Sequence, residues 1–344
     1  MNTVYIHSAP GPWMQEFVPA CEAAGLEPRI ANLENPGCIA WIRGSGPGAI
    51  VFRPNLHLTR FDACIRHLGI LREFGCPILP SWPAVLSYDD KMVQAHQLQA
   101  FGLPHCETRV ATCRDEVEQA AETLGFPLVV KLRSGAGALN VRRIEDLEAL
   151  RRYAQRMLGR GLSPVPGPAA DMGVNLRKAG GLRKSLSKAP GVIAKRVRMK
   201  WLTPRERGYV LMQRFYDGND GDVRVTVLGG RAFVFKRKNR PGDFRASGSG
   251  RIDYVDPATC NAEIKLAFQL VDRLKASYLA VDLILDAGKN PLVVEYSPGF
   301  VLGAIGGCRG YVDHGGNVHP GVFRAADLMA QDIRAAELPP PDGT

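Results

Sequence analysis

The pattern of apolar and polar positions predicts alternating strands and helices in the first 85 residues. Residues 4–7 and 49–52 are short apolar runs of strand length, and helical periodicity follows each run, over residues 12–24 and 61–74. Strands that alternate with helices usually pair in parallel. We therefore predict a small parallel α/β domain over residues 1–85.

A second unit is predicted to begin directly after this domain. Ser87-Tyr88-Asp89-Asp90 resembles a capping box, so a helix is expected over residues 91–100. A short strand at residues 126–131 then leads into a glycine-rich segment and a second strand at 140–144. This order predicts two strands joined by a glycine-rich loop.

The pattern changes again in the second half of the chain. Residues from about 159 to 208 are rich in proline, glycine and basic side chains, which indicates an insertion. The strands expected after it lie at 209–215, 222–228 and 231–238, and Gly229-Gly230 is typical of a two-residue hairpin turn. A helix at 261–275, strands at 278–285 and 291–296, and an amphipathic helix at 322–336 complete the expected elements. We expect three parts, over residues 1–85, 86–208 and 209–338.

Composition narrows the class of protein. A chain of 344 residues with 45% hydrophobic content can bury a sizeable core. It shows no secretory signal and no apolar run near the roughly 20 residues that span a bilayer, so a soluble, cytoplasmic protein without a membrane partner is expected. The eight cysteines include no C-x-x-C pair, which favours reduced thiols, and the net charge of +10 favours anionic partners.

Lys131 and the glycine-rich loop after it are candidates for phosphate binding. Backbone N–H groups in a loop with small side chains can approach phosphate oxygens closely, and a lysine at the end of the preceding strand adds positive charge. A plain hairpin turn would have the same composition, so both interpretations stay open. The loop has no Gly-Lys-Ser/Thr ending and opens no helix, which argues against Walker and dinucleotide-binding motifs.

Two acidic residues interrupt consecutive apolar strands. Asp282 lies in Ala280-Val281-Asp282-Leu283-Ile284, and Glu295 lies in Val293-Val294-Glu295-Tyr296. A buried carboxylate requires a cation or hydrogen-bond donors nearby. Mg²⁺ bound by these acids and by nucleotide phosphates would meet this need, and so would structural arginine or lysine partners.

A basic hairpin is the third candidate element. Strand alternation places Arg224 on one face with Asp222 and Thr226, opposite an apolar face of valines. Lys236 follows on the partner strand, and Arg245 lies shortly after it. The pattern is typical of a polar functional face, but a solvated edge strand would look the same.

Taken in order over residues 85–305, these motifs resemble the ATP-grasp superfamily, and in particular the branch that contains the ligase adding glutamates to a ribosomal protein. The resemblance implies an α/β protein built of α+β subdomains, in which an ATP-grasp fold follows an N-terminal parallel α/β domain. It also implies ATP and Mg²⁺ as cofactors, with the nucleotide between two small sheets.

The resemblance assigns roles to individual residues. The phosphates would be bound by Lys91, Lys131 and a loop acting as a lid, which includes Ser134, Gly135 and Gly137. The adenine and ribose side would involve Gln213, Arg214, Phe215 and Asp222. Magnesium would be held by Asp282, Glu295 and Ser297. Developing charge would be stabilised by Arg224, Lys236 and Arg245.

The sequence departs from the family pattern at three places. Ser297 replaces the asparagine of the usual metal motif, and Arg214 replaces a hinge glutamate, which leaves Asp217 and Asp222 as alternatives for the ribose. The segment after Glu295 resembles a little-characterised ATP-grasp group associated with polysaccharide biosynthesis. His314 and His319 lie in this segment and are interpreted as surface or packing residues.

The reaction that the resemblance implies is ligation of a carboxylate to an amine through an acyl phosphate, with release of ADP. The substrates would be small molecules, and the basic insertion favours an anionic or carbohydrate-linked acceptor. Only Trp201 and Tyr209 accompany the basic residues, too few aromatic side chains for a nucleic-acid stacking platform. Related enzymes often form homo-oligomers. A phosphotransferase and a non-catalytic nucleotide-binding partner protein stay open as alternatives.

Overall fold

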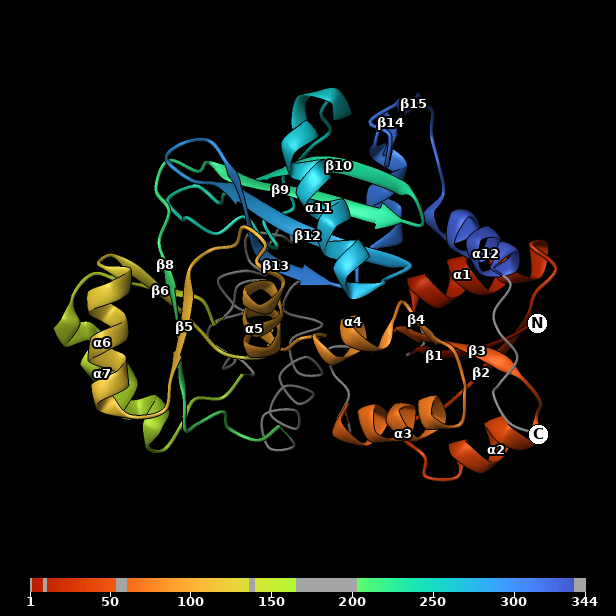
Figure 1. Ribbon diagram of the computed structural model, residues 1–344, viewed down its shortest axis with the longest axis horizontal. Coiled ribbons are helices and arrows are strands. Elements are labelled where there is room, and N and C mark those ends of the chain that lie inside the picture. The colour runs from red at the N-terminus through yellow and green to blue at the C-terminus, as the bar shows by residue number, and fades with distance from the viewer. Residues whose placement is uncertain (1, 9–10, 54–60, 136–139, 165–202, 337–344) are drawn as a thin grey trace, which may run out of the picture. The chain divides into compact units, whose positions relative to one another are not determined.

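The computed structural model describes residues 2–8, 11–53, 61–135, 140–164 and 203–336 (Figure 1). Contacts divide the chain into two compact units, one formed by Met1–His105 with Tyr216–Thr344 and the other by Cys106–Phe215. The three-part division expected from the sequence stays a prediction. Within the described ranges, no helix is both long and apolar enough to cross a bilayer.

The first unit begins with a four-stranded parallel sheet in the order β2-β1-β3-β4, which confirms the predicted parallel α/β arrangement. Residues 49–52 of the central strand β3 are fully buried because helices pack on both sides of the sheet. The strands are β1 (Thr3–Ser8), β2 (Glu27–Ile30), β3 (Gly48–Arg53) and β4 (Ile78–Leu79). The helices are α1 (Pro12–Ala23), α2 (Cys38–Gly44), α3 (Phe61–Glu73), α4 (Trp82–Leu86) and α5 (Lys91–Phe101).

The start of α5 corrects one detail of the sequence analysis. Asp90 is the N-cap residue, and its carboxylate accepts hydrogen bonds from the backbone N–H groups of Met92 and Val93. Ser87 instead ends α4, where its hydroxyl donates to the carbonyl of Ala84. The capping therefore fixes Lys91 as the first residue of α5.

A seven-stranded sheet forms the rest of the first unit, in the order β13-β12-β9-β10-β14-β15 with β11 paired to β10. The hairpin turn predicted at Gly229-Gly230 is confirmed, because Leu228 pairs with Arg231 across it. The strands are β9 (Gly221–Leu228), β10 (Arg231–Lys238), β11 (Ile252–Asp253), β12 (Tyr278–Leu285), β13 (Pro291–Ser297), β14 (Gly310–Asp313) and β15 (Val318–Pro320). The helices are η1 (Pro257–Cys260), α11 (Asn261–Leu274), η2 (Leu302–Gly307) and α12 (Ala325–Ala335).

The two faces of this sheet differ in chemistry. Val223, Val225 and Val227 belong to the core that includes residues of α11, as strand alternation predicted. Figure 1 shows α11 lying across this sheet. On the opposite face, Leu228 and Phe233 join the apolar core formed with α1 and α12. Further along the strands, charged residues occupy this second face.

The second unit is a four-stranded antiparallel sheet in the order β5-β8-β6-β7. Two amphipathic helices accompany it, and each buries one side, for example Leu150, Tyr153, Ala154 and Met157. The strands are β5 (Thr108–Ala111), β6 (Leu128–Lys131), β7 (Arg142–Ile144) and β8 (Val210–Arg214). The helices are α6 (Arg114–Leu124) and α7 (Leu147–Leu158).

Gly221 at the start of β9 tests how closely the hairpin strands pack. A Cβ atom there would lie 2.1 Å from the carbonyl oxygen of Arg237, and backbone cannot yield as a flexible side chain can. We expect Gly221→Ala to lower the free energy of unfolding by about 1–3 kcal/mol in urea titrations. The control is Gly303→Ala, where nothing lies within 4 Å, and it should change stability by less than about 0.5 kcal/mol. Equal stability of the two variants would contradict this packing.

Candidate functional site

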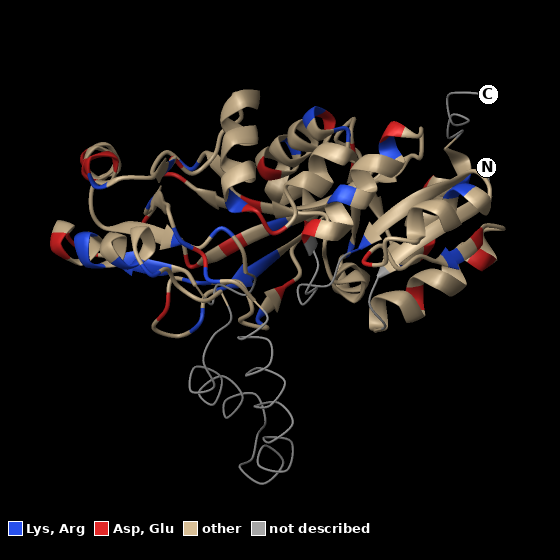
Figure 2. Cartoon of the chain, turned by 90° about the horizontal axis from the view of Figure 1, so that it is seen from below, with Lys and Arg blue, Asp and Glu red and all other residues tan. Residues whose placement is uncertain are grey.

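Four charged side chains form a network on the second face of the seven-stranded sheet, in which Arg237 and Asp282 are buried and Asp222 and Arg224 are half-buried. Arg224 donates from Nε and Nη2 to the two carboxylate oxygens of Asp282, at 2.6 and 2.7 Å. Arg237 donates from Nη2 to Asp282 at 2.7 Å and, through Nε and Nη2, to Asp222 at 2.7 and 2.5 Å. Figure 2 marks acidic and basic residues along the chain and shows both kinds on the central strands.

Strand register explains why these side chains meet. Arg224 on β9 lies directly opposite Asp282 on β12, and Asp222 on β9 lies directly opposite Arg237 on β10. Residues that oppose each other in an antiparallel pair share a face and lie close together. The network therefore ties three adjacent strands together through side chains.

The charges in the network depend on one another. Burial raises the pKa of Asp282, but the adjacent Arg224 and Arg237 outweigh burial and hold the pKa well below its usual value. Burial and the nearby Asp282 charge raise the pKa of Asp222, against the opposing effect of Arg237. Two arginines thus offset two carboxylates within the low-dielectric face.

A second ion pair lies on the same face. Glu295 on β13 is directly opposite Asp282, and its Oε1 lies 3.4 Å from Nζ of Lys91, a side chain only 8% exposed. Gln94 fixes α5 to β13, because its amide donates at 2.9 Å to the carbonyls of both Ser87 and Tyr296. Lys91 is therefore held beside Glu295 by the helix that carries it.

The carboxylates on the network face could bind magnesium only if other oxygen ligands completed its coordination shell. Mg²⁺ takes octahedral oxygen coordination, commonly with one or two carboxylates plus phosphate and water oxygens. Glu295 and Asp282 provide the carboxylates, although Asp282 already accepts from two arginines. Ser297 is engaged locally, since its hydroxyl accepts from the N–H of Gly299 at 3.0 Å. No cluster of three or more His, Cys, Asp or Glu suited to a metal occurs in the described parts of the chain.

The predicted cation Lys236 lies on the opposite face of the sheet from this network, and Arg245 has a carboxylate partner of its own. Lys236 lies opposite Val223 in the hairpin, so it is on the α11 face and is exposed, whereas the arginine on the network face is Arg237. Arg245 forms an ion pair with Asp243, at 2.6 Å, and this hydrogen bond lowers the pKa of Asp243. Arg237 belongs to the predicted basic hairpin but was assigned no role, although the hairpin turn and strand alternation together identify its face.

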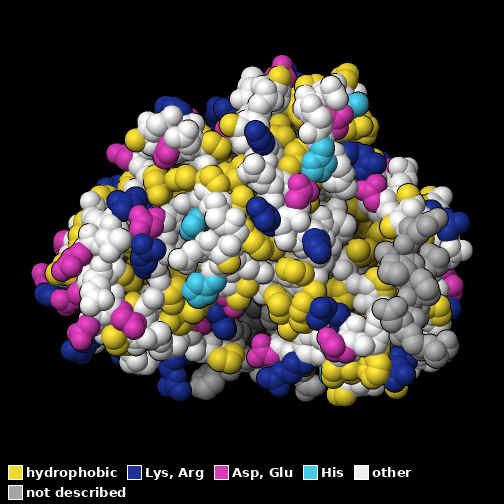
Figure 3. All heavy atoms as spheres, viewed as in Figure 1, with side chains coloured by type: hydrophobic (Ala, Val, Ile, Leu, Met, Phe, Trp, Pro, Cys, Tyr) yellow, Lys and Arg dark blue, Asp and Glu magenta, His cyan; other side chains and the backbone are white. Residues whose placement is uncertain are grey.

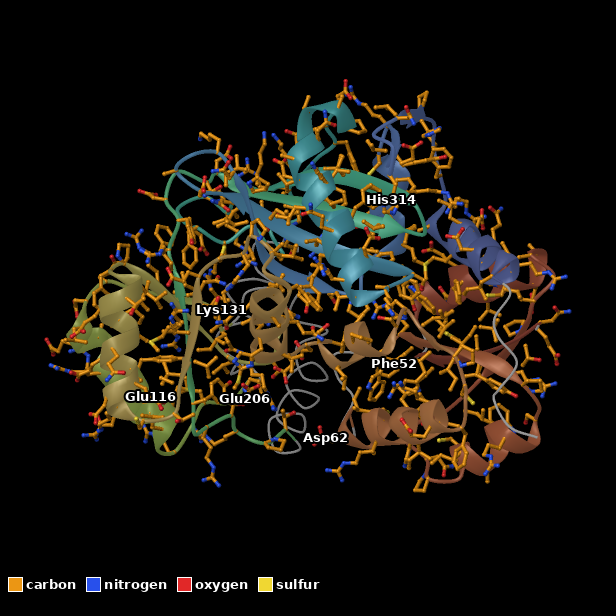
Figure 4. All side chains as sticks on the ribbon, in the orientation of Figure 1. Phe52, Asp62, Glu116, Lys131, Glu206 and His314 are labelled. Atoms are coloured by element: carbon orange, nitrogen blue, oxygen red, sulfur yellow. The ribbon has the colours of Figure 1, made fainter. Side chains whose placement is uncertain are left out.

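The second unit buries Lys131 at the end of β6 (Figure 4). Its Nζ donates to Oε1 of Gln213 on β8 at 2.6 Å, and the amide of Gln213 donates to the hydroxyl of Thr108 at 3.0 Å. Lys131 is 6% exposed and Gln213 is 8% exposed. The predicted residues Lys131 and Gln213 are thus brought together across adjacent strands.

The loop after Lys131 is organised by a carboxylate that the sequence analysis did not identify. Glu206 accepts hydrogen bonds from the backbone N–H groups of Arg133 and Ser134, at 3.0 and 3.2 Å, and from the Ser134 hydroxyl. Gly135 follows with φ of +108°, a conformation that favours glycine. Gly137 and residues 165–202 of the basic insertion lie outside the described residues.

Of the residues predicted for the adenine and ribose side, Arg214 and Phe215 have partners within the second unit, whereas Asp222 lies in the first unit and pairs with Arg237. Arg214 donates from Nε and Nη2 to one carboxylate oxygen of Glu107, at 3.0 and 2.7 Å. The guanidinium of Arg143 lies 4.5 Å from the ring centroid of Phe215. Arg214 replaces the hinge glutamate of the family pattern, but a glutamate still lies beside this position, because Glu107 directly before β5 pairs with Arg214.

The two histidines near the C-terminus stack on aromatic rings. The His314 ring lies 3.9 Å from that of Phe268, and the His319 ring lies 4.6 Å from that of Tyr311. Asp313 accepts from His319 at 2.8 Å, which holds the pKa of Asp313 below its usual value. Figure 3 shows histidines among interspersed acidic and basic side chains on the face in view.

Comparison with known proteins identifies the architecture. Residues 196–303 match the sequence profile of the RimK-like ATP-grasp domain. A RimK domain ATP-grasp protein from Sphaerobacter thermophilus superposes with a TM-score of 0.55 at 17% identity, over 96% of this chain and 99% of that one. N5-carboxyaminoimidazole ribonucleotide synthetase from Thermotoga maritima gives a TM-score of 0.61 at 14% identity, over 99% and 78%.

The fold is the ATP-grasp fold. The resemblance of the sequence to ATP-grasp proteins is thereby confirmed. Mouse carnosine synthase 1 is 26% identical over 185 residues, which cover 51% of this chain and 18% of that protein. The chain spans less than a third of the length of each curated relative that it matches.

The ion-pair network in this ATP-grasp fold makes a prediction for stability. Asp282→Asn leaves the buried Arg237 and the half-buried Arg224 short of a carboxylate, so we expect it to lower the free energy of unfolding at pH 7 by about 3 kcal/mol. The control Glu118→Gln breaks an exposed pair with Arg151, which solvent screens, and it should leave the free energy of unfolding nearly unchanged in the same urea titrations.

The same variant predicts a dependence on pH. Because the folded-state pKa of Asp282 is depressed, its ionised form stabilises the wild type fully above the unfolded pKa near 4. That contribution is lost as the pH falls toward the folded pKa of about 2. The difference between wild type and Asp282→Asn should therefore shrink below pH 4. A difference that grows on acidification would contradict the ion pairing.

Proposed function

We propose that this protein is an ATP-dependent ligase that joins a carboxylate to an amine through an acyl phosphate and releases ADP and phosphate. The observation that carries the proposal is the arrangement of Arg224, Arg237 and Lys91 around two strand-borne carboxylates within an ATP-grasp fold. Phosphoryl transfer is catalysed mainly by positioned cations, and this face holds three cations rigidly.

Each unit would contribute a separate part of the chemistry. In the second unit, Lys131 and the loop backbone at Gly135 would bind phosphate oxygens, with Gln213 and Phe215 near the base. In the first unit, Arg224 and Arg237 would stabilise the negative charge that develops on the transferring phosphoryl group and on the tetrahedral intermediate. Lys236 is less suited to this role, because it lies on the face of the sheet that packs against α11.

Glu295 is the residue best placed to hold magnesium. Among the described residues its carboxylate forms an ion pair with Lys91, whereas Asp282 accepts from two guanidinium groups. We propose Glu295 as the principal ligand, with Asp282 in support and Ser297 acting through the Gly299 turn. The bound ion would neutralise phosphate charge during transfer.

The acyl-phosphate route accounts for the two substrate classes. The substrate carboxylate would attack the γ-phosphate, and the amine would then displace phosphate from the acyl phosphate and form the C–N bond. The relative named carnosine synthase 1 supports an amide-forming reaction. We propose that the basic insertion, about residues 159–208, attracts an anionic or carbohydrate-linked acceptor. Consumption of ATP fits the cytoplasmic location expected from the sequence.

The proposal predicts a specific product and a specific substrate requirement. In a coupled assay with a panel of small carboxylic acids and amines, we expect ADP to form only when a cognate acid and a cognate amine are both present. Lys131→Ala and Glu295→Gln should each lower this turnover by roughly 10²–10³-fold, because Lys131 would bind the phosphates directly and Glu295 would hold the magnesium that neutralises them.

The matched control is Glu118→Gln, which removes an exposed carboxylate of the second unit and should leave turnover unchanged. Formation of AMP and pyrophosphate would exclude the acyl-phosphate route. A stable phosphorylated product formed without an amine would instead indicate a phosphotransferase.

A further inference from the structure

Glu206 is a buried acid within a loop region that is expected to bind anions. Its side chain is 8% exposed and lies in the second unit near the end of β6 (Figure 4). A carboxylate at this position would repel phosphate unless hydrogen bonds from the loop offset its charge. Its hydrogen bonds show that the loop residues provide these donors.

Both oxygens of Glu206 are used by the first residues of the loop. Oε2 accepts from the N–H of Arg133 at 3.0 Å and from the Tyr209 hydroxyl, while Oε1 accepts from the N–H of Ser134 at 3.2 Å and from the Ser134 hydroxyl. The N–H of Arg133 also donates to the Tyr209 oxygen at 2.7 Å. Two consecutive N–H groups that converge on one carboxylate fix the backbone direction immediately after Lys131.

The backbone of Glu206 is itself anchored. It exchanges two hydrogen bonds with Leu162, at 2.9 and 2.8 Å, and this bridge joins the two ends of the segment that contains the basic insertion. Gly161 packs so closely that a Cβ atom would lie 2.4 Å from the Glu206 carbonyl oxygen, and its φ is +72°. Arg205 also donates to the Gly161 carbonyl at 3.0 Å. The backbone that carries the Glu206 carboxylate is therefore fixed by hydrogen bonds and close packing.

We infer that Glu206 is a positioning residue for nucleotide binding, which holds the start of the glycine-rich loop in its phosphate-binding conformation before ATP arrives. This inference rests on the proposed function. The carboxylate acts through the N–H groups of Arg133 and Ser134 and does not contact the nucleotide. A loop ordered in advance loses less conformational entropy when it binds, so removal of the carboxylate weakens binding.

Two measurements on the full-length protein test this role. The first is hydrogen exchange of the Arg133 and Ser134 amides without nucleotide, and the second is the dissociation constant of ATP. In Glu206→Gln one oxygen acceptor becomes an N–H₂ donor, so we expect at least roughly tenfold faster exchange and roughly tenfold weaker ATP binding, the equivalent of 1.4 kcal/mol. Tyr209→Phe removes one donor to Glu206 and should give a smaller loss, about threefold.

Glu116 provides a matched control. Its carboxylate also accepts from one residue's N–H and hydroxyl, those of Thr112 at 2.6 and 2.9 Å, but it lies on the exposed first turn of α6. Glu116→Gln should leave both ATP binding and exchange at Arg133 and Ser134 as in the wild type. If Glu206→Gln fails to fold, ATP affinity and amide exchange measured on Tyr209→Phe test the role of Glu206 in its place, and wild-type values for both would overturn it.

The outcomes separate the inference from the function on which it rests. Wild-type protein that does not bind ATP would overturn the proposed function. Wild-type protein that binds ATP while Glu206→Gln binds equally well or more tightly would overturn only the role of Glu206, and tighter binding would show a carboxylate that competes with phosphate. Unchanged amide exchange in Glu206→Gln would likewise overturn it.

Discussion

The bridge that Asp282 makes between Arg224 and Arg237 is the interaction on which the proposed chemistry depends. It joins β9, β10 and β12 at their charged ends, while the same strands bury valines under α11 on the other face. A buried ion pair contributes little net stability, because desolvation offsets much of the attraction. Its effect here is geometric: two guanidinium groups that would otherwise sample many rotamers are held in one arrangement, beside Lys91 and Glu295.

In the second unit, a buried carboxylate likewise fixes the direction of backbone N–H groups. Glu206 holds two N–H groups of the glycine-rich loop as Asp282 holds two arginines, and Gln213 holds Lys131 in a comparable way. In each case the partner is an internal acceptor on a neighbouring strand or bridge. Groups arranged in advance need little reorganisation when charge develops, which is the principal source of electrostatic catalysis.

Much of the fold could be predicted from the sequence, because several of its strands are either wholly apolar or alternate between apolar and polar residues. Residues 49–52 and the valines of β9 belong to these two types, and the Gly229-Gly230 turn set the hairpin register. No prediction was made for α6 and α7, although α7 buries Leu150, Tyr153, Ala154 and Met157 at helical spacing. The position of Arg237 on the network face could also have been predicted, since the hairpin register places it opposite Asp222. The contact of Glu206 with Ser134 could not have been predicted, because the two residues are 72 positions apart and a basic segment without periodicity separates them.

The most direct test of the ligase mechanism follows the oxygen atoms of the acid substrate. The cognate acid, labelled with ¹⁸O in its carboxylate, is turned over with ATP and the cognate amine, and the released phosphate is examined by ³¹P NMR. Attack of the carboxylate on the γ-phosphate predicts one ¹⁸O atom in each inorganic phosphate formed. Phosphate that carries no label while the C–N bond forms would contradict an acyl-phosphate intermediate.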